Sequence, residues 1–213
     1  MTITVLGSIN IDITAYSERL PRPGETISGN SYILGLGGKG ANQAVAASRL
    51  GARTIFVGRA GDDSFAAAAV NQLEGFGVGA NFILRDRDSS TGIAIIGVER
   101  SGENAITIVS GANMKHDARE IERARAELGH TKVLLLQLET PLGVALDAAR
   151  IVRAAGGLVV LDPAPAPAGG IGGDVLANID LITPNETETS ALTGILPSSA
   201  DEGITAARKL RAL

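Results

Sequence analysis

The chain has 213 residues, which is enough for one domain with a real hydrophobic core. It has no cysteine and two histidines, which excludes disulfides and Cys-based zinc sites and argues against a His-rich metal site or a Ser–His triad. A net charge of −4 and 3% aromatic residues argue against nucleic-acid binding, and no signal peptide or membrane-spanning apolar run is visible. We therefore expect a cytoplasmic protein that binds neither nucleic acid nor membrane.

Two polar side chains, Asn10 and Asp12, follow the first predicted strand at 3–6. In an extended chain they face the same way, because side chains alternate along a strand. Open α/β sheets bind ligands just past the carboxyl ends of their strands. A ligand-binding pair and a pair that only caps a loop are both consistent with this pattern.

Segment 35–51 is a glycine-rich turn that leads into a helix, from about Ala41 to just before Gly51. Its glycines allow a ligand to approach the main chain closely. The first free N–H groups of the helix favour oxygen-rich ligands. Asn42, in the first turn, can both donate to and accept from a hydroxyl group.

Three interpretations of this turn compete. It is a tight turn without a ligand, a dinucleotide site, or a polyol site in which Gly38, Lys39 and Asn42 hold sugar hydroxyls. The dinucleotide interpretation depends on the GxGxxG spacing of residues 35–40 and on the later Asp62. That fingerprint normally follows the first strand of a domain, which is not its position here. A phosphate-binding P-loop is excluded, because glycine follows Lys39 where Ser or Thr is required.

Strands and helices alternate over the rest of the chain. This rhythm predicts an α/β fold with a mainly parallel sheet and helices on both faces. Segments 13–34 and 91–109 interrupt it and are expected to form a small separate sheet over the strand ends. The charged helix 117–128 is expected to be a solvated outer face. The other predicted strands are 54–58, 132–138, 158–161 and 180–183, and the other predicted helices are 64–74, 141–155, 186–193 and 199–213.

Three further polar residues are candidates for a site. Glu139 follows the apolar strand 132–138, where a carboxylate needs a ligand, water or donors unless it is simply exposed. Asn185 and Glu188 have the spacing of a helix capping box. The functional alternative for this pair is a helix N-terminus that faces phosphate and Mg²⁺.

Taken together, these motifs resemble the ribokinase family of sugar kinases, the phosphofructokinase-B type. The resemblance implies a ribokinase-like α/β domain over residues 1–213, C-terminally incomplete, with lid segments inserted at about 13–34 and 91–109. The motifs occur in family order and span nearly the whole chain: GSINID at 7–12, GGKGANQ at 37–43, GDD at 61–63, LE at 138–139, PAP at 163–165 and TPNETE at 183–188.

The resemblance implies ATP-dependent phosphorylation of the 5-hydroxyl of D-ribose. It places Asn185 and Glu188 near the ATP phosphates and Mg²⁺, with Glu188 as the residue on the metal side. The small sheet would be a lid that excludes water, and in relatives it also pairs two subunits, which implies a homodimer. The residues that the resemblance assigns to sugar binding are Asn10, Ile11, Asp12, Gly38, Lys39, Gly40, Ala41, Asn42 and Glu139.

In the family, a later glycine-rich segment carries the catalytic base, and the same portion supplies most of the adenine pocket and the loop that binds a monovalent cation such as K⁺. We expect these parts beyond Leu213, and therefore no catalytic base within the chain and no turnover by these 213 residues alone. The alternatives are a kinase for fructose, deoxyribose or a nucleoside, and a non-catalytic sugar-binding module. A dinucleotide-dependent oxidoreductase is the least favoured. The scarcity of aromatic residues disfavours a nucleoside.

Overall fold

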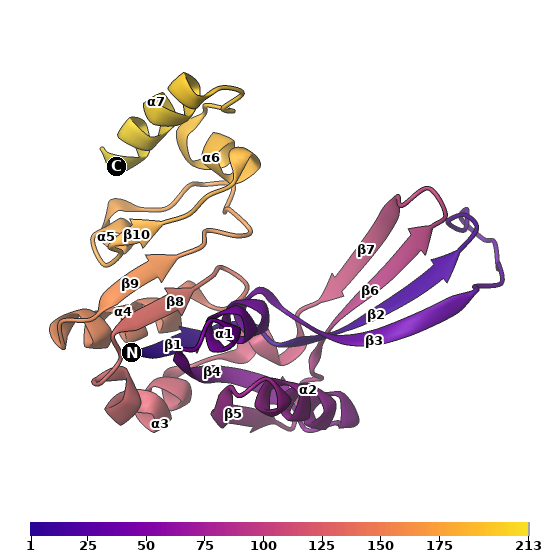
Figure 1. Ribbon diagram of the computed structural model, residues 1–213, viewed down its shortest axis with the longest axis horizontal. Coiled ribbons are helices and arrows are strands. Elements are labelled where there is room, and N and C mark those ends of the chain that lie inside the picture. Colours follow the sequence, from indigo (N-terminus) through magenta and orange to yellow (C-terminus); the bar gives the residue numbers. More distant parts are fainter. Residues whose placement is uncertain (213) are drawn as a thin grey trace.

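The apolar runs of the sequence form the larger of two sheets in the computed structural model, which describes residues 1–212 (Figure 1). Its six strands run in the order β10-β9-β8-β1-β4-β5, and every neighbouring pair is parallel. The predicted parallel sheet is therefore confirmed. Its strands are β1 (Thr2–Leu6), β4 (Arg53–Gly61), β5 (Gly79–Asp86), β8 (Val133–Leu136), β9 (Leu158–Leu161) and β10 (Leu181–Ile182).

Helices cover both faces of this sheet, because successive apolar side chains of a strand point to opposite sides. Val5 contributes to one hydrophobic core and Leu6 to the other. The core around Val5 is closed by α1 (Lys39–Arg49) and α2 (Ser64–Gly75). The core around Leu6 is closed by α3 (Ala118–Leu128) and α4 (Leu142–Ala154).

A second, four-stranded sheet projects away from the first (Figure 1). Its order is β3-β2-β6-β7, with a parallel central pair and antiparallel outer pairs. The small sheet that the sequence predicted is therefore present, although its first strand begins at Asn10 and so includes the polar pair. Its strands are β2 (Asn10–Ser17), β3 (Ser31–Gly37), β6 (Gly92–Glu99) and β7 (Asn104–Val109).

Local side-chain bonds and glycine conformations explain where the helices begin and end. Asp63 caps α2, since its side chain accepts a hydrogen bond from the Ala66 N–H at 2.9 Å. Gly51 has the positive φ of 88° expected for the residue that ends α1. The remaining elements are the 3₁₀ helix η1 (Gly111–Lys115), α5 (Gly173–Leu176), α6 (Glu186–Thr193) and α7 (Ala200–Arg211).

The structure corrects two expectations. Strand β5 was not predicted; it is a half-exposed edge strand that contains Asn81, Arg85 and Asp86, so its sequence lacks a clear apolar run. Helix α3 is not simply a solvated face, because Glu120 is completely buried. Its carboxylate accepts from the guanidinium of buried Arg59, with Nε–Oε1 at 2.5 Å and Nη2–Oε2 at 2.8 Å.

None of the helices in the described range 1–212 combines the length and the apolarity that a membrane crossing requires.

Candidate functional site

The strand order of the large sheet reverses beside β1. From β1 the sheet continues through β4 to β5 on one side, and through β8 and β9 to β10 on the other. Ligands of open α/β sheets bind outside the carboxyl ends of the strands at such a switch point. Ser8 follows β1 at this point and Glu139 follows β8, so the fold brings the predicted Glu139 to the position where a ligand is expected.

Glu139 binds the start of helix α1. Its Oε2 atom accepts from the Ser8 hydroxyl at 2.5 Å and from the Lys39 N–H at 3.0 Å. Ser8 holds the next two N–H groups, those of Gly40 and Ala41, through its Oγ and its carbonyl oxygen. These N–H groups were expected to be free for an oxygen-rich ligand. They are instead satisfied by the chain itself, because the pairing of β1 with β8 brings Glu139 onto the helix end.

Close packing explains the glycines of the turn. Gly38 has a φ of 91°, and a Cβ there would lie 2.8 Å from the Ser8 carbonyl oxygen. A Cβ on Gly40 would lie 2.7 Å from the Ser8 nitrogen. Ala41 is also fully buried, whereas Asn42 is exposed to solvent. The turn is therefore required by the contact between α1 and the end of β1, whether or not a ligand binds.

Asn10 and Asp12 share one face of β2, as their spacing predicted. Asp12 is half-buried, and its pKa is raised, first by burial and then by the negative charge of Glu139. A Cβ on Gly37 in the neighbouring strand would lie 1.9 Å from Asp12 Oδ1, so this carboxylate lies over Gly37. Ile11 points its side chain into the core, which leaves only its backbone to face a ligand. The Asp12 carboxylate is thus held over Gly37, where the negative charge of Glu139 still reaches it.

A cavity of about 290 Å³ opens beside Asn10 and Glu139. Its volume is near the lower end of the ~300–1,000 Å³ typical of small-molecule sites, which suits a monosaccharide. Carboxylates accept hydrogen bonds from several hydroxyl groups at once, and such charge-assisted bonds are strong. The residues that line the cavity are Ser8, Asn10, Ile108, Ser110, Asn113, Met114, Leu138, Glu139 and Pro165.

Asp162 directly follows β9, at the same edge of the large sheet as Ser8 and Glu139. Its carboxylate accepts from the side-chain amide of Gln43 at 3.3 Å. Burial raises its pKa, and the negative charges of Glu188 and Glu139 add to that effect, while Lys39 opposes it. The pKa of Asp162 is therefore raised both by Glu139, on the predicted sugar side, and by Glu188, on the predicted phosphate side. Sequence reasoning assigned it no role, although its place after a buried strand is the signal that pointed to Glu139.

Asn185 and Glu188 form the capping box that their spacing predicted. The Asn185 side chain accepts from the Glu188 N–H at 2.8 Å, and Glu188 Oε2 accepts from the Asn185 N–H at 2.9 Å. Glu188 Oε1 also accepts from the Asn185 side-chain amide at 3.0 Å. Each carboxylate oxygen retains a lone pair, so this geometry is compatible with a further ligand.

Residues 1–212 contain no cluster of three carboxylate or histidine side chains that would hold a metal by itself. Mg²⁺ usually takes one or two protein carboxylates together with phosphate oxygens and water. Asp162 and Glu188 are two such carboxylates: burial is the first cause of the raised pKa of Asp162, and the negative charge of Glu188 adds to it. A cation bound with a nucleotide would offset this repulsion.

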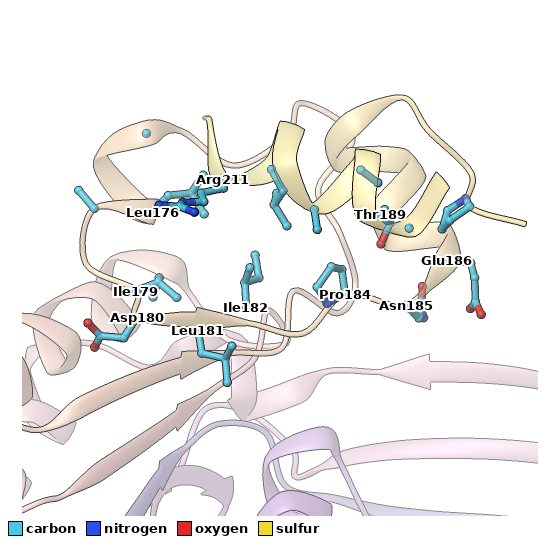
Figure 2. A pocket seen from close by; sticks show the side chains of 17 residues that line it. Leu176, Ile179, Asp180, Leu181, Ile182, Pro184, Asn185, Glu186, Thr189 and Arg211 are labelled. Atoms are coloured by element: carbon cyan, nitrogen blue, oxygen red, sulfur yellow. The ribbon is translucent and has the colours of Figure 1, made fainter. Parts of the chain in front are cut away.

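A larger cavity, of about 1080 Å³, lies between β10 and α7 (Figure 2). Ile179 and Ile182 border it on the β10 side, Leu176 lies near Arg211, and Asn185 and Glu186 lie at one end. Unlike the smaller cavity, it is lined by neither Asn10 nor Glu139. We therefore place the candidate sugar site at the smaller cavity, on chemistry rather than on volume.

Asn113 is a polar residue of the smaller cavity that sequence reasoning passed over, as are Ser8 and Ser110. It lies in η1, directly after the small sheet, and is 1% exposed. Its side chain binds both the backbone of Ile9 and the side chain of Asn10. The local sequence offers only a Gly-Ala-Asn turn, so no signal in it points to a partner about a hundred residues earlier.

Comparisons with known proteins agree with this geometry. The sequence pattern of the pfkB family carbohydrate kinase matches residues 2–213. The chain is 41% identical over 206 residues to a ribokinase of Haemophilus influenzae, covering 97% of this chain and 67% of the relative. It is 35% identical over 210 residues to a deoxyribokinase of Salmonella typhi, covering 99% of this chain and 68% of the relative. The chain thus spans about two thirds of the length of these relatives.

Among solved structures, the Arabidopsis thaliana ribokinase complexed with ribose and ATP superimposes with a TM-score of 0.88 at 35% identity. The match covers 99% of this chain and 68% of that structure. The ordered motifs, the switch-point site and these similarities agree, and the chain belongs to the pfkB family of carbohydrate kinases.

Proposed function

We propose that this chain is the sugar-binding part of an ATP-dependent kinase that phosphorylates the 5-hydroxyl group of D-ribose. The observation that carries the proposal is the cavity of about 290 Å³ at the switch point, which Asn10 and Glu139 line, with Asp12 on the same face of β2 as Asn10. The two carboxylates accept hydrogen bonds from sugar hydroxyl groups, and Asn10 adds an amide. Gly38, Lys39 and Asn42 border the sugar from the turn before α1 and from its first turn.

In the proposed reaction, the oxygen of the sugar hydroxyl forms a bond to the terminal phosphorus of ATP while the bond to ADP breaks. The hydroxyl proton passes to a base, and the charge on the transferring group needs stabilisation. The base, the adenine pocket and a K⁺ loop are assigned to no residue of this chain. Within residues 1–213, Asp12 and Glu139 hold and orient the sugar.

Asn185, Glu188 and Asp162 form the proposed phosphate side. Glu188 and Asp162 would hold Mg²⁺ together with phosphate oxygens, and the bound cation would supply charge neutralisation for the phosphates. The Asn185 capping bonds keep the Glu188 carboxylate at the start of α6. A reaction that consumes ATP favours the cytoplasm as the compartment.

The small sheet is the proposed lid. Ile108 of β7 lines the sugar cavity, so a movement of this sheet changes access to the site. Closing it over a bound sugar would keep water from receiving the phosphoryl group. The same sheet is the proposed contact between two subunits of a homodimer.

Calorimetry with D-ribose tests the proposal on the 213-residue chain. Asp12→Ala should weaken ribose binding without unfolding the chain, because loss of a charged hydrogen bond costs about 1.5–3 kcal/mol, which is roughly ten- to a hundredfold in affinity. Asp147→Ala is the matched control, since Asp147 is an exposed carboxylate on α4 that pairs with Arg150. Equal ribose affinity of native chain and Asp12→Ala would refute the role of Asp12.

A kinase for deoxyribose is the second candidate, because the Salmonella typhi relative is a deoxyribokinase. Titration with 2-deoxyribose and fructose alongside ribose separates these substrates: the tightest ligand identifies the sugar. A non-catalytic sugar-binding module is the third candidate, and it predicts ribose binding that an ATP analogue with Mg²⁺ leaves unchanged. The 213-residue chain alone should show no ribose-dependent ATP consumption.

A further inference from the structure

We propose that Asn113 is a positioning residue that fixes which end of the Asn10 side-chain amide faces the sugar. The proposal deepens the proposed function and rests on it. Asn113 lies outside the sequence motifs that were assigned to sugar binding, and it acts on the site through Asn10.

The two side chains form a buried amide pair in the wall of the sugar cavity. Asn113 is 1% exposed and Asn10 5% exposed, and both line the cavity. Asn113 Oδ1 accepts from the Ile9 N–H at 2.9 Å, and Asn113 Nδ2 donates to the Ile9 carbonyl oxygen at 3.2 Å. The same Nδ2 donates to Asn10 Oδ1 at 2.7 Å.

The backbone decides the orientation of both amides. A backbone N–H can only donate and a backbone carbonyl can only accept, so Ile9 leaves one arrangement for the Asn113 side chain. In that arrangement the Asn113 NH₂ group points at Asn10. The Asn10 atom that faces it must therefore be the oxygen, because two NH₂ groups cannot bond to each other. The Asn10 NH₂ group is left on the other side of the amide, where it has no partner within residues 1–212.

A glycine makes room for this pair. Gly92 lies opposite Asn10 in the pairing of β6 with β2. A Cβ at Gly92 would lie 2.1 Å from Asn10 Oδ1 and 2.4 Å from Asn113 Nδ2. Only a glycine at position 92 leaves room for the contact between the two amides. This steric observation is independent of the hydrogen bonds.

This geometry sets the polarity of the site. Asp12 and Glu139 offer only acceptors when ionised, and Asn10 offers a donor beside them. A hydroxyl group satisfies both kinds of partner, since its oxygen accepts from Asn10 and its proton is donated to a carboxylate. A site with three acceptors would leave the hydroxyl oxygen without a donor from these residues. Asn113 thereby selects for a polyol oxygen at this position.

A double-mutant cycle on ribose affinity tests the proposal. Asn113→Asp removes the NH₂ group and favours a reversed Asn10 amide, so ribose binding should weaken about tenfold, the effect of one lost hydrogen bond. In an Asn10→Ala background the same change should alter the affinity less than about twofold, because no amide remains to be oriented. Asn71→Asp, on the exposed side of α2, is the matched control and should leave ribose affinity unchanged.

Two outcomes would overturn the proposal: unchanged ribose affinity in Asn113→Asp, or an equal loss in both backgrounds, which would indicate a purely structural role. Asn113→Ala is the second variant if Asn113→Asp does not fold, as judged by its thermal unfolding midpoint, and the same cycle applies to it. Failure of the proposed function is recognised separately, since Asp12→Ala would then leave ribose binding unchanged.

Discussion

Gly37 and Gly35 lie on the same strand, β3, and differ sharply in the space that surrounds them. A Cβ on Gly37 would lie 1.9 Å from Asp12 Oδ1, whereas one on Gly35 would have no atom within 4 Å. Neither residue has a positive φ, so the difference is purely steric. Gly37→Ala should displace the Asp12 carboxylate and weaken ribose binding about tenfold. Gly35→Ala is the matched control, and calorimetry that finds equal ribose affinity for both variants would contradict this role of Gly37.

His116 makes stability depend on pH. It is buried beside α3, and burial, with the nearby Arg59 charge, lowers its pKa to about 4, against the opposing effect of Glu120 and Asp117. Between pH 6.5 and 4 the unfolded chain binds a proton at this residue that the folded chain does not. The free energy of unfolding therefore falls as the pH is lowered through this window, by about 2 kcal/mol between pH 7 and pH 5.

His116→Leu should abolish this fall, because it removes the imidazole that takes up the proton. The replacement loses no hydrogen bond, since neither ring nitrogen of His116 has a hydrogen-bonding partner within the described chain. Urea unfolding at pH 7 and pH 5 measures it, with His130→Leu as the control for an exposed histidine. The expectation fails if native chain and His116→Leu lose the same stability between the two pH values.

At the scale of elements, one buried ion pair fastens helix α3 to the large sheet. Arg59 of β4 and Glu120 of α3 are almost completely buried, and Asp86 and Asp117 also approach the guanidinium, at 3.4 and 3.1 Å. Glu120→Ala would leave the Arg59 charge with weaker partners and should destabilise the chain by about 3–5 kcal/mol. Glu122→Ala, on the exposed side of α3, should change stability by less than about 0.5 kcal/mol. Urea denaturation compares the two; a small effect for Glu120→Ala would refute the anchoring role.

Element by element, the sequence predicted strands and helices where apolar patterns and caps coincide. The Asn185–Glu188 capping box is confirmed, because its bonds close within three residues. Strand β5 was missed, since an edge strand is half-exposed and its pairing with β4 shifts register between Ile55 and Val57. The burial of Glu120 was missed because its partner lies 61 residues away.

At the scale of the whole molecule, the small sheet leaves apolar side chains exposed on both faces. Ile33 and Ile106 belong to one face, and Leu34 and Ile95 to the other, and all four are at least half-exposed. Long exposed apolar strands at a sheet edge usually have a partner, and two copies related by a twofold axis would supply it. This exposed apolar surface supports the proposed homodimer.

Light scattering during gel filtration should give twice the chain mass for the native protein. Ile106→Lys and Leu34→Lys place a charge on opposite faces of the small sheet, so at least one of them should give the single-chain mass. Leu50→Lys is the control, since Leu50 is exposed at the end of α1, away from this sheet. A native protein of single-chain mass, or two lysine variants that both stay dimeric, would contradict pairing through this sheet.

The sequence by itself determined the alternation of strands and helices, the helix caps and the glycine turn, because these depend on residues within a few positions of one another. The ordered motifs also pointed to the carbohydrate kinase family. Only the tertiary structure decided which polar groups meet. Ser8 reaches Glu139 across 131 residues, because the strand order places β8 beside β1, and Asn113 reaches Ile9 across 104, because η1 packs against β4 and β6. Local pattern encodes the path of the backbone, whereas the chemistry of the site depends on contacts that the order of the strands creates.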